Sequence, residues 1–219
     1  MADPNSRSGV RYADGAILRY ADELHAPHDE ALAAAAEAPE RQGLPAIQVG
    51  PSEGRFLQLL LRLAGARRVV EVGTLAGYSA IWMARALPTG GVLYSIEVDP
   101  RHAEVARENL TRADLAARTE VRVGDAAEIL PELAAEGPFD AVFLDADKAR
   151  YPVYGAWAAE NLRAGGLLIG DNVYLFGRLR EDSDEARAMR RFHEQAAEAF
   201  DTACVPTPDG LLVGVRRTS

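Results

Sequence analysis

Short apolar runs alternate with amphipathic stretches along most of this chain. The runs are bounded by polar residues and have the length of strands buried on both faces of a parallel sheet. They lie at 69–72, 92–98, 139–144 and 167–170, with an alternating run at 119–123. Helical patterns follow each run, at about 78–87, 100–113, 126–135, 149–162 and 184–199. Five such strand–helix units predict a doubly wound, Rossmann-like α/β sheet.

The two ends of the chain add to this sheet. Residues 203–205 and 211–215 flank a segment rich in proline and glycine, which predicts a C-terminal antiparallel hairpin. Residues 13–38 favour helix, with a break at Ala26 because the residue before a proline disfavours the α conformation. A further helix is expected over 52–64, ended by Gly65. We expect one domain over 1–219, with 1–50 as a helical cover over the site and 51–219 as the core.

Composition restricts the class of protein. The chain has 219 residues, 48% hydrophobic and 26% charged, as is ordinary for a soluble globular protein. A net charge of −9 argues against a nucleic-acid partner, because phosphate binding needs a basic face. No apolar run approaches the ~20 residues that span a bilayer, so no membrane partner is expected. A single cysteine, Cys204, and an N-terminus without signal-peptide features indicate a cytoplasmic protein.

Acidic and amide side chains follow two of the predicted strands. Asp145 comes directly after the run at 141–144, and Asp171 and Asn172 follow the run at 167–170. Because open α/β sheets place their ligands at the carboxyl ends of the strands, these oxygens are expected at one shared cation site. Hard oxygen ligands suit Mg²⁺, with Ca²⁺ or Mn²⁺ as alternatives.

Lys148 is the only lysine in a chain with 24 lysines and arginines together. It stands beside Asp145 and Asp147. An arginine guanidinium does not lose its proton in a protein, whereas a lysine amine can when its surroundings lower its pKa. The choice of lysine here favours a general base. The alternative is a lysine left by chance in a surface salt bridge.

A glycine-containing turn follows the first strand, in the segment from Glu71 to Ser79. Its glycines, Gly73 and Gly77, allow a tight turn and close approach of a ligand. A carboxylate at Glu71 would repel a pyrophosphate, so the turn disfavours NAD and favours a nucleoside with a cationic tail. Glu97, 26 residues further on, can accept hydrogen bonds from ribose hydroxyls.

S-adenosylmethionine meets both demands, since it carries a ribose and a sulfonium-bearing amino acid. Its carboxylate could use Ser79 and the helix N-terminus. Three alternatives stay open at this point. The two glutamates could be charges on the rim of the surface, the protein could be an NAD-dependent reductase on the same fold, or it could be a non-catalytic nucleoside-binding protein.

With these residues assembled, the chain resembles the cation-dependent O-methyltransferases, the group that contains catechol and caffeoyl-CoA O-methyltransferases. The resemblance runs from about Val49 to the C-terminus and rests on Glu71–Ser79, Asp145–Tyr151 and Asp171-Asn172. It implies a class I methyltransferase sheet, a homodimer, a Mg²⁺-type ion held by Asp145, Asp171 and Asn172, and Lys148 as the base. It implies S-adenosylmethionine contacts at Val49, Glu71, Gly73, Thr74, Ser79, Glu97, Ala126, Asp145 and Asp147.

The substrate is less well defined. Chelation by a metal implies two neighbouring oxygens, as in a catechol or in a 2-hydroxyacyl group on a carrier. Phe176 stands where plant relatives have an asparagine that contacts substrate, and nothing matches their basic N-terminal residue near coenzyme A, so a coenzyme A thioester is not expected. The apolar segment Tyr174–Phe176 suits an aromatic or greasy substrate, or serves only in packing or a dimer contact. Asp147 could instead be a helix N-cap.

Overall fold

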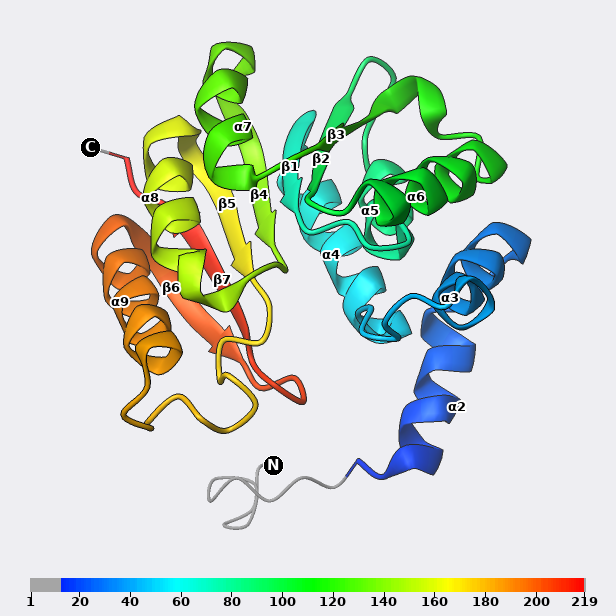
Figure 1. Ribbon diagram of the computed structural model, residues 1–219, viewed down its shortest axis with the longest axis horizontal. Helices are drawn as coiled ribbons and strands as arrows, with labels where there is room; N and C mark the ends of the chain where they lie inside the picture. Colours follow the sequence, from blue (N-terminus) through cyan, green and yellow to red (C-terminus); the bar gives the residue numbers. More distant parts are fainter. Residues whose placement is uncertain (1–12, 219) are drawn as a thin grey trace.

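The computed structural model describes residues 13–218, and a seven-stranded sheet forms its centre (Figure 1). The strands are β1 (Arg68–Val72), β2 (Val92–Glu97), β3 (Thr119–Val123), β4 (Phe139–Leu144), β5 (Leu162–Gly170), β6 (Phe200–Val205) and β7 (Leu211–Arg216). Their order is β3-β2-β1-β4-β5-β7-β6. The first five strands are parallel, and β7 runs antiparallel to both β5 and β6. The predicted doubly wound sheet with a C-terminal antiparallel hairpin is confirmed.

Helices surround this sheet, and most of them cover one of its two faces. They are α2 (Gly15–His25), α3 (Glu30–Gln42), α4 (Pro51–Leu63), α5 (Tyr78–Ala84), α6 (Pro100–Arg112), α7 (Ala126–Leu133), α8 (Tyr151–Asn161) and α9 (Asp184–Ala199). Short 3₁₀ turns lie at Ala116–Arg118, Ala134–Glu136 and Lys148–Arg150. In Figure 1, α7, α8 and α9 lie on one side of the strands, and α4, α5 and α6 on the other.

The alternation of side chains along β1 explains these two layers. Val69 packs into the cluster that contains Leu57 of α4 and Ile81 of α5. Val70 and Val72 pack into the opposite cluster, which α7, α8 and α9 complete. Because successive side chains of a strand point to opposite faces, a central strand with apolar residues at consecutive positions has to be covered on both sides.

Several predicted boundaries differ from the structure, and β6, for example, begins at Phe200 rather than at Ala203. β5 begins at Leu162 rather than at Leu167. The strand includes Gly165 and Gly166, whose sequence does not predict a strand. Helix α5 ends at Ala84, earlier than expected. The break at Ala26 is confirmed, because α2 ends at His25 and α3 begins at Glu30. The one-domain prediction includes residues 1–12 and 219, which lie outside the described residues, and it stays a prediction.

Candidate active site

A cavity of about 570 Å³ opens at the carboxyl ends of the parallel strands. It lies where the strand order reverses, since β2 follows β1 on one side and β4 borders β1 on the other. Open α/β sheets bind ligands at such a switch point, and the volume is that of a small-molecule site. Residues that follow β1 to β5 all contribute to its wall.

The turn after β1 requires glycine at Gly73. Its φ is +95°, and a Cβ placed there would lie 2.0 Å from the carbonyl oxygen of Asp145. Only a residue without a side chain lets β1 and the end of β4 approach this closely. The turn therefore brings the residues predicted to bind the nucleoside next to Asp145, a predicted metal ligand.

Glu97 anchors the same turn from the end of β2. Its Oε2 accepts hydrogen bonds from the backbone amides of Thr74, at 3.1 Å, and Leu75, at 2.8 Å. Its Oε1 accepts one from the amide of Asp99 at 3.0 Å. The side chain lines the cavity while only 7% of the residue is exposed. Since each carboxylate oxygen has two lone pairs, one acceptor site on Oε1 remains for a hydroxyl group of a ligand.

Glu71 lies deeper than the sequence indicates. It is fully buried, with Oε1 accepting a hydrogen bond from Ser79 Oγ and Oε2 one from Ser95 Oγ, both at 2.5 Å. Burial raises its pKa to about 7. It is absent from the described residues that line the cavity, whereas Ser79 lines it, so Glu71 supports the wall from behind. The alternative that Glu71 and Glu97 are rim charges is wrong, because both are buried.

Lys148 is held between an acid and a phenol. Its Nζ donates to Asp145 Oδ1 at 2.9 Å and to the hydroxyl of Tyr151 at 2.8 Å. That hydroxyl lies 2.8 Å from the carbonyl oxygen of Leu144 and 2.9 Å from that of Asp171. Tyr151 therefore ties the ends of β4 and β5 together and presents Lys148 to the cavity. Lys148 is only 8% exposed, so the surface salt bridge left by chance does not describe it.

Asp171 and Asn172 follow β5, the strand that pairs with β4. Asp171 is 5% exposed, and its pKa is raised to about 7 by burial and then by the charge of Asp145. Its Oδ1 accepts a hydrogen bond from the amide of Asn172 at 2.7 Å. Asn172 has a φ of +53° and lines the cavity, as Asp145 does.

These residues fit a divalent cation. The charge of Asp145 adds to the cost of ionising the buried Asp171, a positive charge would offset that cost, and both side chains present hard oxygens. Within residues 13–218 no group of three histidine, cysteine, aspartate or glutamate side chains could hold a metal. A site here would thus take the amide oxygen of Asn172 as its third protein ligand.

The remaining predicted cofactor residues lie around the same cavity. Val49, Thr74, Ala126 and Asp147 all line it. Asp147 also caps the 3₁₀ turn that carries Lys148, because its Oδ1 accepts from the amide of Ala149 at 3.0 Å. The N-cap interpretation is correct for Asp147, and its side chain faces the cavity as well.

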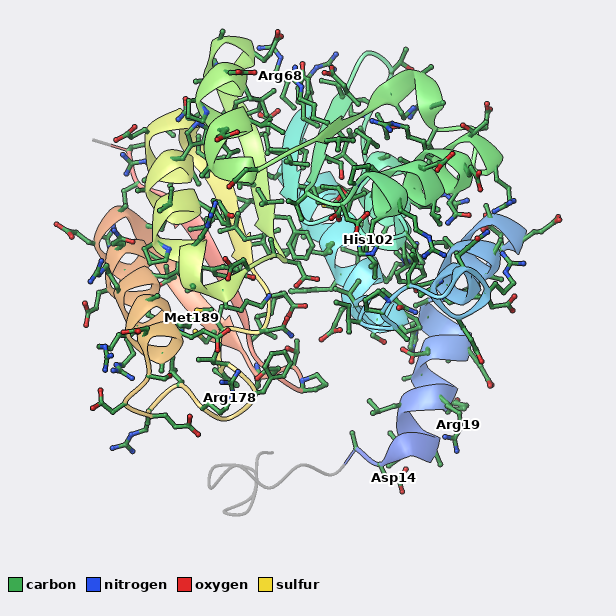
Figure 2. The ribbon with its side chains drawn as sticks, in the orientation of Figure 1. Asp14, Arg19, Arg68, His102, Arg178 and Met189 are labelled. Carbon is green, nitrogen blue, oxygen red and sulfur yellow. The ribbon has the colours of Figure 1, made fainter. Side chains whose placement is uncertain are left out.

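Sequence reasoning missed several residues of this site. Ile47, Gln48 and His102 line the cavity, and His102 Nδ1 lies 3.6 Å from Glu97 Oε1. Figure 2 shows His102, near the start of α6, close to the middle of the molecule. Its position in the first turn of the helix after β2 was a usable signal, since the first turns of such helices face the switch point. Nothing in the sequence pairs Ser95 with Glu71.

The N-terminal segment reaches the site differently from the expected cover. None of the residues of α2 is buried, none lines the cavity, and Figure 1 shows α2 projecting away from the sheet. His28, between α2 and α3, instead lies with Nε2 2.7 Å from the hydroxyl of Tyr78, a buried residue of the cavity wall. The large apolar side chains of α2 are exposed, so this helix does not pack over the site.

The fold and the acid-lined turn at its switch point define a nucleoside-binding α/β enzyme. A family model described as O-methyltransferase matches residues 22–217, and this chain belongs to that family. A catechol O-methyltransferase of Niastella koreensis is 46% identical over 182 residues, covering 81% of this chain and 82% of the relative. One of Mycobacterium tuberculosis is 48% identical over 161 residues, covering 74% and 73%. The solved O-methyltransferase TomG of Streptomyces achromogenes, in complex with S-adenosylmethionine, superposes with a TM-score of 0.88 at 37% identity, covering 93% and 96%.

The protein is an S-adenosylmethionine-dependent O-methyltransferase. The reductase and the non-catalytic binding protein, the two rival interpretations of the sequence, are thereby set aside. No helix in the part of the chain that the structure describes is long and apolar enough to cross a membrane.

Proposed function

We propose that this enzyme methylates one hydroxyl of a catechol, with a divalent cation held by Asp145, Asp171 and Asn172 and with Lys148 as the base. One observation carries the proposal. Asp145, after β4, and Asn172, after the paired strand β5, line one cavity together with the buried Lys148, and Asp171 is buried directly before Asn172. Two adjacent acceptor oxygens are what such a cation can bind together, and the names of the relatives from N. koreensis and M. tuberculosis support the catechol.

Mg²⁺ is the ion we propose, because three protein oxygens leave positions open for other ligands. When bound, such an ion would make a catechol hydroxyl more acidic and fix its orientation. Asp145 would then contact both the cation and Lys148, since its Oδ1 already accepts a hydrogen bond from Lys148. Tyr151 keeps both strand ends at a fixed separation and so keeps the ligand set together.

Lys148 takes the proton of the acceptor hydroxyl in this mechanism. Its Nζ is fixed by Asp145 and Tyr151, so its remaining position is free to face the acceptor. The hydroxyl oxygen forms its new bond to the methyl carbon as the bond from that carbon to sulfur breaks, which leaves neutral S-adenosylhomocysteine. Holding the two reactants in line can supply ~7–11 kcal/mol of the barrier.

The cofactor residues have separate tasks in this proposal. Glu97 would accept a ribose hydroxyl on Oε1 while its Oε2 holds the turn after β1. Val49, Gly73, Thr74, Ala126 and Asp147 line the cavity around the nucleoside and its tail. Ser79, backed by the hydrogen bond to Glu71, faces the amino-acid end of the cofactor.

A product assay tests the function. The purified protein is supplied with S-adenosylmethionine and either catechol or phenol, and the methylated product is measured by mass spectrometry. We expect methylation of catechol, loss of activity with EDTA and recovery with Mg²⁺. Phenol, which has one hydroxyl, is the matched control and should react poorly. Equal turnover of phenol and catechol, or indifference to EDTA, would refute the chelated acceptor. A 2-hydroxy acid in the same assay tests the other acceptor that has two adjacent oxygens.

A homodimer is a further part of the proposal. The apolar side chains of Ile17, Leu18, Tyr20 and Leu24 on α2 are exposed, which suits a second copy. Light scattering on the purified protein gives the mass directly, and a monomer at micromolar concentration would contradict the dimer.

A further inference from the structure

The loop after β5 has an unusual backbone. Asn172, Leu175 and Phe176 have φ values of +53°, +54° and +53°. This left-handed conformation is strained for Leu175 and Phe176, whereas asparagine tolerates it better. Such a backbone persists only where its surroundings hold it in place. The loop carries Asn172 at one end and Phe176 four residues later, and both line the cavity.

The tip of the β6–β7 hairpin holds this loop. The amide of Val173 donates to the carbonyl of Gly210 at 3.1 Å, and the amide of Tyr174 donates to the carbonyl of Asp209 at 2.9 Å. The amide of Phe176 donates to Asp209 Oδ1 at 2.8 Å. The first two bonds use backbone that any residue supplies, whereas the third needs the side chain of Asp209.

Loop and hairpin tip are closely fitted at Gly210. Its φ is +76°, and a Cβ there would lie 2.7 Å from the ring of Tyr174. Asp209 is the chain neighbour of Gly210, and its carbonyl accepts the hydrogen bond from the amide of Tyr174, so its backbone is held at this contact. Its second oxygen, Oδ2, is buried and has no hydrogen-bond partner among the described residues. An unpaired buried oxygen lowers stability, so one oxygen of this carboxylate destabilises the fold while the other holds the loop.

Phe176 is the residue of this loop that would contact the acceptor. Its residue is 65% exposed, yet it lines the same cavity as Asn172 and Lys148. An exposed aromatic ring at a cavity wall offers a flat apolar surface to a ligand ring. The position of this ring follows from the backbone of Phe176, and Asp209 Oδ1 holds that backbone.

We propose that Asp209 is a positioning residue for the acceptor. It fixes Phe176 as the wall against which an aromatic acceptor packs, and it thereby decides which of the two hydroxyls faces the methyl donor. The inference rests on the proposed catechol acceptor. Asp209 touches neither acceptor nor cofactor and acts through Phe176.

The test is a set of variants: Asp209→Ala, Asp209→Asn, Phe176→Ala and the Asp209→Ala/Phe176→Ala double variant. The acceptor is a catechol with one ring substituent, so that two monomethyl products are possible. We expect Asp209→Ala to raise KM for the acceptor by about tenfold and to shift the product ratio, with kcat within about threefold and the Kd for S-adenosylhomocysteine unchanged. Asp209→Asn keeps an oxygen acceptor and should restore wild-type values.

The double variant should be no worse than Phe176→Ala alone, because Asp209 acts only through that ring. Additive losses, or equal losses in Asp209→Asn and Asp209→Ala, would overturn the proposal. Asp201→Ala is the matched control, since this acid lies on β6 of the same hairpin and pairs with Arg217 at the surface. It should leave KM and product ratio unchanged.

Two measurements distinguish a failure of this inference from misfolding of a variant and from a failure of the proposed function. Hydrogen exchange of the peptide 173–178 needs no substrate, and it should rise in Asp209→Ala but not in Asp209→Asn; unchanged exchange in Asp209→Ala would refute the contact. Gly210→Ala tests the same contact where Asp209→Ala does not fold, because the new Cβ displaces the tip from Tyr174. Failure of the wild-type protein to methylate any catechol would refute the acceptor while leaving the exchange result to decide on Asp209.

Discussion

Lys148 Nζ lies 2.9 Å from Asp145 Oδ1 and 2.8 Å from the hydroxyl of Tyr151, with the residue 8% exposed. A guanidinium placed there keeps the charge next to Asp145 but does not accept a proton. The sequence indicated this residue by type, and the structure adds the two partners that hold it. Whether Lys148 is the base can be decided by a single conservative change.

Lys148→Arg should lower kcat by about 10²-fold or more, the usual contribution of a general base. The Kd for S-adenosylmethionine should stay within about twofold, because cofactor residues are unaltered. Stopped assays and calorimetry measure the two quantities. Arg191→Lys, at an exposed position of α9, is the control and should have normal turnover. Near-normal turnover of Lys148→Arg would exclude the base role.

The position of Glu71 along the strand is predicted by the sequence, whereas its depth in the protein is decided by packing. Its position at the end of β1 follows from the sequence, but its burial depends on α5 packing over that face, where Ser79 meets it. Because burial raises its pKa from 4.5 to about 7, the folded protein binds a proton that the unfolded chain releases. Its contribution to stability is therefore fully present below about pH 4.5 and decreases as the pH rises towards about 7.

Glu71→Gln should remove this loss. We expect the variant to gain about 2 kcal/mol in free energy of unfolding relative to wild type on going from about pH 5 to about pH 8. Urea unfolding at both pH values measures the gain. Glu194→Gln, a solvent-facing acid on α9, provides the comparison and should show no such difference. A pH-independent effect of Glu71→Gln would mean that Glu71 is ionised throughout.

The secondary-structure elements of the core were readable because each has its own local signal. Pro100 begins α6 and Asp99 caps it, and Ser183 caps α9 through its hydroxyl. The sequence also predicted α2 as a helix, but it did not predict how α2 packs. Nothing within residues 13–218 buries the apolar side chains of this helix. The contact that joins this region to the cavity, from His28 to Tyr78, links residues fifty positions apart.

His28→Ala should weaken the link between the N-terminal segment and α5. The hydroxyl of Tyr78, whose pKa is raised to about 12 by burial, loses its imidazole partner, and we expect a loss of about 1 kcal/mol in free energy of unfolding. Combining it with Tyr78→Phe should give a smaller loss than the sum, because the two residues share one bond. His25→Ala, at the exposed end of α2, should have no effect. Denaturant titrations of the four variants provide the values, and full additivity would show that the bond contributes nothing.

At the scale of the whole molecule, the arrangement of strands brings two acids together. β4 and β5 are paired, so Asp145 and Asp171 emerge side by side, and the charge of Asp145 raises the pKa of Asp171. The folded protein without a cation carries this repulsion. A cation that binds only the folded state should therefore stabilise the entire domain.

Mg²⁺ at about 100 times its Kd should raise the free energy of unfolding by about 2.7 kcal/mol and the Tm by roughly 5–10 °C. Asp171→Ala should abolish this shift and leave the affinity for S-adenosylhomocysteine largely intact. Asp201→Ala should retain the full shift, since that acid lies at the surface of β6. Thermal unfolding with EDTA and with Mg²⁺ measures the effect. A wild-type Tm that is the same with EDTA and with Mg²⁺ would contradict the metal site.

The sequence by itself determined the elements, the class of fold and most of the chemical groups at the strand ends. It could do so because periodicity, caps and strand-end acids are local properties of the chain. Glu97 and Lys148 were predicted as site residues in this way, from residue type and position alone. His102 gave a local signal that was overlooked.

Only the tertiary structure decided which of these groups meet. The order of the strands puts Gly73 against the end of β4, buries Glu71 under α5, and inserts β7 beside β5. That insertion carries Asp209 to the loop of Phe176, 33 residues away in the chain. Contacts of this kind depend on how layers pack across long sequence distances, and no pattern of neighbouring residues encodes them.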